Sequence, residues 1–242
     1  MSKPQIIMPS SDQGFHNSQW DQTKERLGAS KSYQDLSTIC LIPSPNGFIH
    51  TRVAQNMMSQ MIPMNQKFMR IFINNMEVGE GYSTMIDNIL ADPNLSTWKY
   101  ILTWEWDNLA PVDGLLKLYE STDKYDIIGG IYFTKGEAGQ PMCYGKMDEY
   151  PINFKPFLPP ADSVTPCRGT AMGFTLYKMD IFKDKNIPRP FFKTLQEVGD
   201  QGARSYTQDL YFAENAGKAG YKSAIDSRVR VGHYDWNTDI VW

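Results

Sequence analysis

The sequence has no excess of charge of one sign. Its 24 Lys and Arg residues nearly balance its 27 Asp and Glu residues, which leaves a formal net charge of -3. Neither sign forms a block along the chain, whereas general nucleic-acid binders carry clustered basic residues. We therefore expect no general affinity for nucleic acid.

Cysteine is scarce. Cys40, Cys143 and Cys167 are the three in the chain, and they are widely spaced, with no CxxC pattern and no histidine pair nearby. An odd number at such spacing argues against both a disulfide framework and structural zinc. The cysteines therefore predict a reducing compartment.

Targeting signals and long apolar runs are also missing. The first fifteen residues, MSKPQIIMPSSDQGF, lack a basic start followed by an apolar run, and no later segment is as long as a membrane span. We expect a cytoplasmic protein without a membrane span.

Two common enzyme signatures are absent as well. No GxGxxG follows any predicted strand, and no GxSxG occurs. These absences exclude a dinucleotide-dependent oxidoreductase and a hydrolase with a nucleophile elbow.

Strand-like and helix-like segments alternate through the first half of the chain. Residues 1–36 are polar with little periodicity and read as an N-terminal arm, which leaves 37–242 as a single domain. Alternating strand and helix patterns follow at 37–43, 49–61, 68–74, 81–92, 98–108, 112–123 and 125–133. This alternation predicts an α/β fold with a mainly parallel central sheet flanked by helices.

The second half is less regular. Residues 135–166 are rich in Pro, Gly and Tyr and predict loops with short strands. A strand with a short helical turn is predicted at 169–182, a helix at 205–221 and an alternating strand at 223–235. We expect a smaller antiparallel portion in this half.

The segment YILTWEWDNL, residues 100–109, ends a strand-like run with two carboxylates. In an extended backbone, residues two apart point to the same side, so Glu105 and Asp107 would converge on one point. Two carboxylates that leave coordination positions open suit Mg²⁺ or Mn²⁺ bound to nucleotide phosphates. The pair alone is also compatible with carboxylates that face solvent or cap a helix.

A second group of candidate residues follows the first predicted strand. Pro43, Ser44 and Asn46 come directly after residues 37–43. In open α/β sheets, ligands bind beyond the carboxyl ends of the strands. These three residues are therefore candidates for binding the same ligand.

Three segments taken together resemble a known family. They are ILTWEWDNLAPVDGLLKLYESTDKYDIIGGIYF (101–133), GTAMGFTLYKMDIF (169–182) and TQDLYFAENAGKAGYKSAIDSRVRVGHYD (207–235). Their order is similar to that in nucleotide-sugar-dependent glycosyltransferases of the GT-A fold, in the small single-domain form common in phages and bacteria. The resemblance covers roughly residues 37–235, and it implies the host cytoplasm as the location if the protein is viral.

The resemblance implies a metal site. The family motif Asp-x-Asp is replaced by Glu105-Trp106-Asp107. Asp107 corresponds to a direct metal ligand, and Glu105 to a ligand that reaches the ion directly or through water, or that contacts the ribose. His233 matches the third ligand that the family supplies late in the chain. An imidazole ligand favours Mn²⁺ over Mg²⁺.

The resemblance also implies a catalytic base and further contacts. Asp209 corresponds to the residue that takes the proton from the acceptor hydroxyl in inverting members, and we favour this role over the alternative of an ordinary carboxylate at a helix N-terminus. Gly173 would allow the backbone to approach the donor or acceptor, or would simply form a tight turn. Trp106 is expected near the ligand, while most other aromatic rings fill the core.

The expected activity is therefore metal-dependent transfer of a sugar from a UDP- or GDP-sugar to a hydroxyl of a glycan, protein or modified-base acceptor, with inversion if Asp209 is the base. Lys135, Arg168 and Arg204 are candidates for stabilising the leaving diphosphate. One alternative is a nucleotidyltransferase, for which PSPNGFIHTR (43–52) is a poor phosphate-binding loop. The other is a non-catalytic sugar- or protein-binding module that uses exposed aromatic residues.

Overall fold

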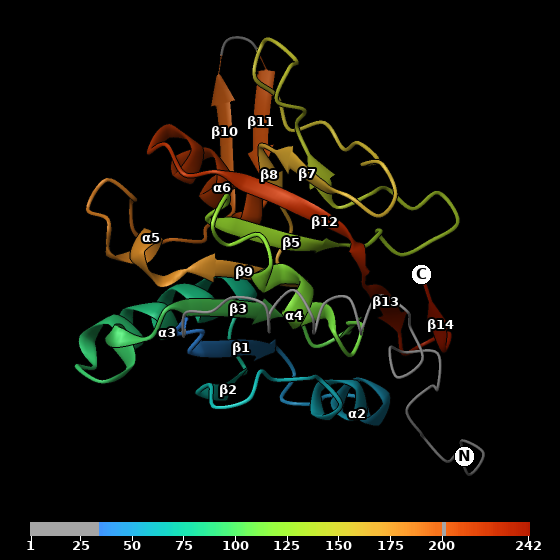
Figure 1. Ribbon diagram of the computed structural model, residues 1–242. Coiled ribbons are helices and arrows are strands. Elements are labelled where there is room, and N and C mark those ends of the chain that lie inside the picture. The colour runs from blue at the N-terminus through green and yellow to red at the C-terminus, as the bar shows by residue number, and fades with distance from the viewer. Residues whose placement is uncertain (1–33, 200–201) are drawn as a thin grey trace.

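A seven-stranded sheet forms the centre of the molecule (Figure 1). The computed structural model describes residues 34–199 and 202–242. Within them the strand order is β2-β1-β3-β9-β5-β12-β7. The bounds are β1 Thr38–Ser44, β2 Phe68–Asn74, β3 Tyr100–Trp104, β5 Ile127–Ile131, β7 Val164–Cys167, β9 Phe174–Lys178 and β12 Ser223–Arg230.

Most strands of this sheet point the same way. β1 is parallel to β2 and β3, and β5 is parallel to β12. β9 lies antiparallel between β3 and β5, so those two strands share one direction, and β7 is antiparallel to β12. The mainly parallel sheet predicted from the sequence is confirmed, with β9 and β7 as its antiparallel members.

Both faces of the sheet are covered by helices. Along β1, Cys40 and Ile42 pack into one core cluster, and Ile39 and Leu41 pack into the other. This two-residue alternation is what a fully buried strand requires. The helices are α2 Thr51–Met58, α3 Val78–Ala91, α4 Gly114–Tyr119, α5 Met179–Lys183 and α6 Gln208–Lys218, with a 3₁₀ turn η1 at Leu95–Thr97. α2 and α4 contribute to the first cluster, and α3, α5 and α6 to the second.

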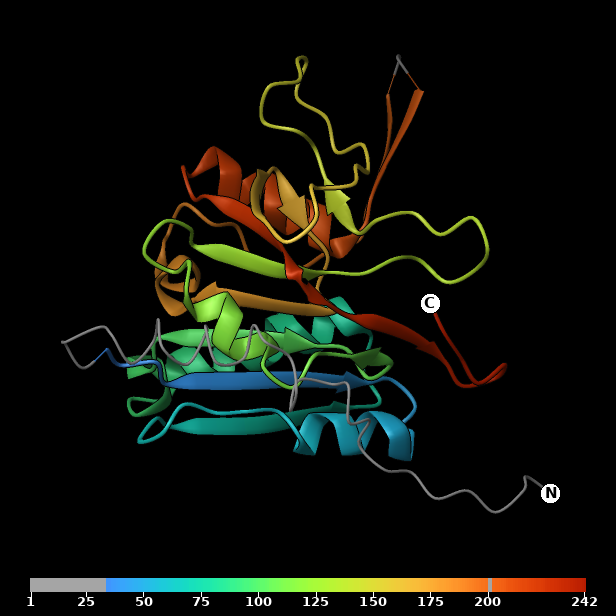
Figure 2. The same ribbon diagram turned by 45° about the vertical axis from the view of Figure 1, so that its right-hand side comes forward.

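Three small antiparallel sheets complete the second half, as predicted. They are β14-β13-β4, made of Ile240–Val241, Gly232–Asp235 and Asn108–Leu109; β6-β8, made of Cys143–Tyr144 and Gly169–Thr170; and the hairpin β10-β11, made of Leu195–Gly199 and Gly202–Tyr206. Figure 2 shows the β13 and β14 segment at the right of the molecule, beyond the carboxyl ends of β1 and β3.

Two predicted elements have different bounds. The helix expected from residue 205 begins at Gln208, because Tyr206 is the last residue of β11 and Thr207 is extended, with φ -72° and ψ 161°. The strand expected over 223–235 is divided into β12 and β13, which belong to different sheets. The division places His233 opposite β4 instead of in the central sheet.

The predicted arm over 1–36 falls mainly outside the described residues. Of the part that the structure describes, Leu36 is buried in the first core cluster. In the described part of the chain, every helix is too short or too polar to cross a membrane.

Candidate active site

The predicted acidic motif lies in a turn after β3. The strand expected to reach Asn108 ends at Trp104, and the Asn108 amide donates to the Glu105 carbonyl at 3.1 Å. The expectation that Glu105 and Asp107 lie on one side of an extended strand is therefore wrong, because the backbone turns there. The turn is attached to the central sheet, since the Glu105 amide donates to the Gly173 carbonyl at 3.0 Å.

The small sheet β14-β13-β4 brings His233 to Asp107. His233 is paired with Asn108, the residue that follows Asp107. Nε2 of His233 lies 3.3 Å from Oδ2 of Asp107. Nζ of Lys135, from the loop after β5, lies 2.6 Å from the same oxygen. One imidazole nitrogen and one ammonium nitrogen therefore meet at one carboxylate oxygen, and the ammonium group supplies a positive charge there.

The His233 ring is held from its other side. Nδ1 lies 2.8 Å from the carbonyl oxygen of Phe133. A carbonyl oxygen can only accept, so Nδ1 carries a proton. In the neutral ring, Nε2 then directs a lone pair at Asp107, and a favourable contact requires a proton or a metal ion between the two atoms. Metal-binding histidines are commonly held in this way, by a hydrogen bond from the other ring nitrogen.

The two carboxyl groups of the motif are shifted in opposite directions. Burial alone would raise the pKa of Asp107, but hydrogen bonds and charges from His233 and Lys135 lower that pKa below its ordinary value. Burial, together with the negative charges of Asp107 and Asp209, raises the pKa of Glu105 to about 8, while Lys135 opposes the shift. The Glu105 carboxyl therefore takes up a proton near neutral pH unless a cation approaches it.

The predicted metal ligands are only partly assembled. No three His, Cys, Asp or Glu side chains of the described residues are grouped so that they could hold a metal ion by themselves. Asp107 and His233 nevertheless present an oxygen and a nitrogen to one point, and the Glu105 carboxyl interacts electrostatically with Asp107. This donor set fits a divalent ion that takes its other ligands from a bound phosphate group.

Asp209 lies in the first turn of α6 and is only 8% exposed. Burial raises its pKa, although hydrogen bonds from the Thr207 side chain and the Leu210 amide oppose the shift. Its charge also raises the pKa values of Glu105 and Tyr144, so these three groups lie near one another. Asp209 is therefore a basic carboxylate close to the acidic motif.

Gly173 contacts the core as well as the motif. Its amide donates to the hydroxyl oxygen of Tyr132 at 2.9 Å, and an added Cβ would lie 2.5 Å from Cζ of that ring. Close packing is thus one reason for glycine here. Trp106 is half-buried, and Nζ of Lys135 lies 6.0 Å from the centroid of its ring.

The loop after β1 is organised by Ser44. The Ser44 hydroxyl donates to the Phe48 carbonyl at 2.9 Å, and the Gly47 amide donates to the Ser44 carbonyl at 2.9 Å. Pro43 and Ser44 are buried, whereas Asn46 is exposed. β1 and β3 are paired in parallel, so this loop and the acidic turn follow neighbouring strand ends.

The other predicted cations and rings have varied positions. The Arg168 guanidinium donates to the carbonyl oxygens of Lys146, Met147 and Glu149, so it supports that loop. The side chain of Arg204 lies outside the described residues. Trp104 is fully buried, with Nε1 donating to the Asn108 carbonyl at 2.9 Å, so it is one of the rings that fill the core.

One group that orients the site was not predicted. The Phe133 carbonyl holds the His233 ring, but a backbone carbonyl gives no signal in the residue types. Lys135 was named only as a candidate for the leaving group, and its contact with Asp107 depends on the path of the loop after β5.

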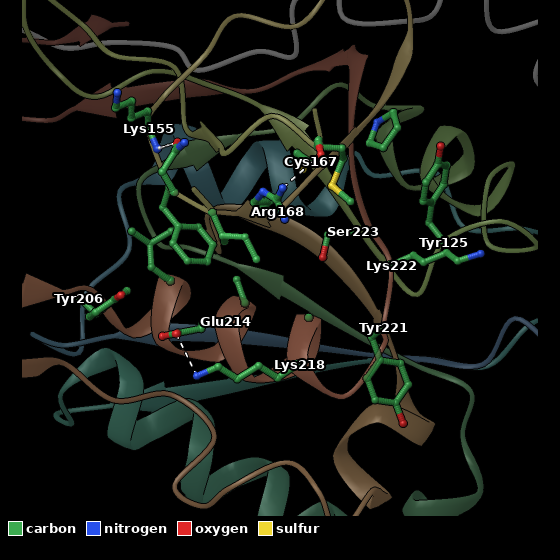
Figure 3. A pocket seen from close by; sticks show the side chains of 18 of the residues that line it. Tyr125, Lys155, Cys167, Arg168, Tyr206, Glu214, Lys218, Tyr221, Lys222 and Ser223 are labelled. Atoms are coloured by element: carbon green, nitrogen blue, oxygen red, sulfur yellow. Dashed lines mark hydrogen bonds and ion pairs between the residues drawn. The ribbon is translucent and has the colours of Figure 1, made fainter. Parts of the chain in front are cut away.

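A cavity of about 1030 Å³ lies along α6 (Figure 3). Glu214 and Lys218 of α6 line it and form an ion pair at 2.9 Å, while Tyr221 and Ser223 line it at the start of β12. Glu105, Asp107 and His233 do not line it. The cavity is therefore separate from the acidic turn.

Comparison with known proteins finds likeness in structure only. Neither a protein-family model nor a curated protein matches the chain. The crystal structure of A197 from STIV matches 82% of this chain and 86% of its own, with a TM-score of 0.56 and 16% identity. The crystal structure of GalNAc-T7 with UDP, GalNAc and Mn²⁺ matches 84% of this chain, with a TM-score of 0.53 and 11% identity. This chain spans 44% of the GalNAc-T7 chain. At such identities the likeness shows the fold.

Proposed function

The chain has the GT-A fold, and from this premise we propose that it is a metal-dependent glycosyltransferase that uses a nucleotide-sugar donor. The observation that carries the proposal is the contact between Asp107 and His233, 3.3 Å between Oδ2 and Nε2, beyond the carboxyl end of β3. GalNAc-T7 was solved with UDP, GalNAc and Mn²⁺. Its ligands favour a UDP-sugar and Mn²⁺ over GDP and Mg²⁺ here.

Asp107 and His233 would hold the ion, and Glu105 would join them directly or through water. When bound, the ion neutralises the negative charge that builds on the diphosphate as the sugar leaves. Lys135 adds an ammonium group 2.6 Å from Asp107, so its positive charge acts at the same place. In the free protein, the Lys135 ammonium group keeps the Asp107 carboxylate from being an uncompensated charge.

Asp209 would be the catalytic base. The acceptor oxygen attacks the anomeric carbon, the bond from that carbon to the diphosphate oxygen breaks, and the hydroxyl proton moves to Asp209. Its raised pKa makes Asp209 a stronger base than an ordinary aspartate. A single in-line displacement of this kind inverts the anomeric centre.

The donor would lie across the carboxyl ends of β1 and β3. Trp106 offers an indole ring beside Lys135, and the loop containing Pro43, Ser44 and Asn46 follows the neighbouring strand. The backbone of Gly173 is hydrogen-bonded to the Tyr132 hydroxyl on one side and to the Glu105 amide of the acidic turn on the other. The acceptor is a glycan, a protein or a modified base, and the proposal covers transfer to its hydroxyl group.

The test uses Asp107→Ala, with Asp180→Ala as the matched control. Asp180 is a highly exposed carboxylate on α5, with its side chain 84% exposed. Calorimetry would measure UDP and GDP affinity with and without Mn²⁺, and release of nucleotide from UDP- and GDP-sugars would measure turnover. Asp107→Ala is expected to lose Mn²⁺-dependent binding and turnover, because it loses a direct ligand, whereas Asp180→Ala retains both. Nucleotide binding that ignores Mn²⁺ and is unchanged in Asp107→Ala would refute the proposal.

A further inference from the structure

The strand β14 brings Trp242 alongside His233. The His233 amide donates to the Trp242 carbonyl, and the Trp242 amide donates to the His233 carbonyl, both at 3.0 Å. In an antiparallel pair of this kind, opposite side chains point to the same face, with Cβ atoms roughly 4.5–5.5 Å apart. The Trp242 and His233 side chains therefore leave the small sheet on the same face.

The indole N–H of Trp242 is a buried donor without a partner. Nε1 is shielded from solvent and meets no acceptor among the residues that the structure describes. Trp104 differs, because its Nε1 donates to the Asn108 carbonyl. An indole nitrogen can only donate, and a buried donor left unpaired is costly. An external acceptor at this position would remove that cost.

We propose that Trp242 binds the donor substrate, and that its indole N–H donates a hydrogen bond to an oxygen of the nucleotide diphosphate. This inference rests on the proposed function. An ion held by Asp107 and His233 would take phosphate oxygens as its remaining ligands. The groups next to His233 would then meet the diphosphate, which offers charged acceptors to a donor-only side chain.

The test uses Trp242→Phe, which removes the N–H and keeps an aromatic ring. Trp236→Phe is the matched control, because Trp236 lies in the same terminal segment and is 54% exposed. Calorimetry with UDP, and separately GDP, in the presence of Mn²⁺ is expected to show affinity about 10-fold lower or weaker still in Trp242→Phe, as for a lost hydrogen bond to a charged group. Trp236→Phe is expected to match the unaltered protein.

Thermal unfolding without ligand separates a binding role from a structural one. No protein hydrogen bond of the indole is lost in Trp242→Phe, so its midpoint is expected to be unchanged or higher. Unchanged nucleotide affinity would overturn the inference and leave the proposed function standing, provided that Asp107→Ala still loses binding. A lowered midpoint would assign the indole a structural role and would also overturn the inference. Absence of Mn²⁺-dependent binding by the unaltered protein would defeat both proposals.

Discussion

Gly173 joins the buried core to the acidic turn. Its amide donates to the Tyr132 hydroxyl oxygen, and its carbonyl accepts from the Glu105 amide. The Tyr132 ring approaches so closely that no side chain fits between them. The position of Glu105 thus depends on a residue that must be glycine because the Tyr132 ring leaves no room for a side chain.

Gly173→Ala is expected to reduce the free energy of unfolding by about 1–3 kcal/mol, because the added methyl group overpacks the core against Tyr132. Urea denaturation would measure it. Gly217→Ala is the control, since an added Cβ there meets nothing within 4 Å near the end of α6, and it should raise stability by up to about 1 kcal/mol. Equal stability of the two variants would show that the contact with Tyr132 relaxes freely.

At this scale the sequence predicted which side chains share one place, and it missed what orients them. Asp107 and His233 were named together, and the structure places their side chains 3.3 Å apart. Their role as metal ligands stays a prediction. The Phe133 carbonyl and the Trp242 indole were not predicted, because their importance comes from strand pairing and not from residue type.

Among the elements, α4 and β12 are joined by the partly buried guanidinium group of Arg228. Arg228 of β12 lies 2.7 Å from Asp226 on its own strand and 2.7 Å from Glu120 at the end of α4. These contacts outweigh burial and raise the pKa of Arg228 above its already high ordinary value, chiefly through the hydrogen bonds that Arg228 donates to Asp226. The helix is therefore held to the strand by charge as well as by apolar packing.

Arg228→Met is expected to lower the free energy of unfolding by about 3–5 kcal/mol, because Asp226 has no exposed surface and would lose its cation. Lys183→Met is the control, since Lys183 and Asp180 form an exposed pair on α5, and such pairs contribute at most about 1 kcal/mol. Denaturation midpoints of the two variants would check this. A similar small loss in both variants would mean that the interactions of Arg228 with Asp226 and Glu120 contribute no more to stability than an exposed ion pair does.

Elements with a sustained apolar pattern were predicted, and several short elements without one were not. Helix and strand periods identified β1, β2 and α3 closely, because each has a sustained apolar pattern. The hairpin β10-β11 was missed because its segments are polar and short, and β4 and β13 were read as extensions of longer strands. Pairing between distant segments determines such elements, and a local pattern does not contain it.

In the whole molecule, the candidate site is assembled from distant parts of the chain. Asp107, Lys135 and His233 follow three different strands of the central sheet and meet at one carboxylate oxygen. The order of motifs along the sequence was sufficient to predict the fold class, which the sheet topology confirms. The antiparallel position of β9 between β3 and β5 was not predictable, because the direction of a strand depends on the path of the chain that connects it to its neighbours.

A ligand that joins these segments should stabilise the entire fold. UDP and Mn²⁺ together, at about 100 times the dissociation constant, are expected to add about 2.7 kcal/mol to stability. For a chain of this size the unfolding midpoint should then rise by roughly 5–10 °C. Scanning calorimetry would measure the shift, and EDTA should abolish most of it. An equal shift in EDTA would show that nucleotide binds without the ion.

The burial of all three cysteines has a practical consequence. Cys40 and Cys143 have no exposed surface and Cys167 is 2% exposed, and burial raises the pKa of Cys40 to about 12. Alkylating reagents need an accessible thiolate, so they react only in the moments when the chain opens locally. The labelling rate of the native thiols therefore measures how often the chain opens locally. A cysteine introduced on the surface can be labelled with a fluorophore while the native thiols remain unreacted.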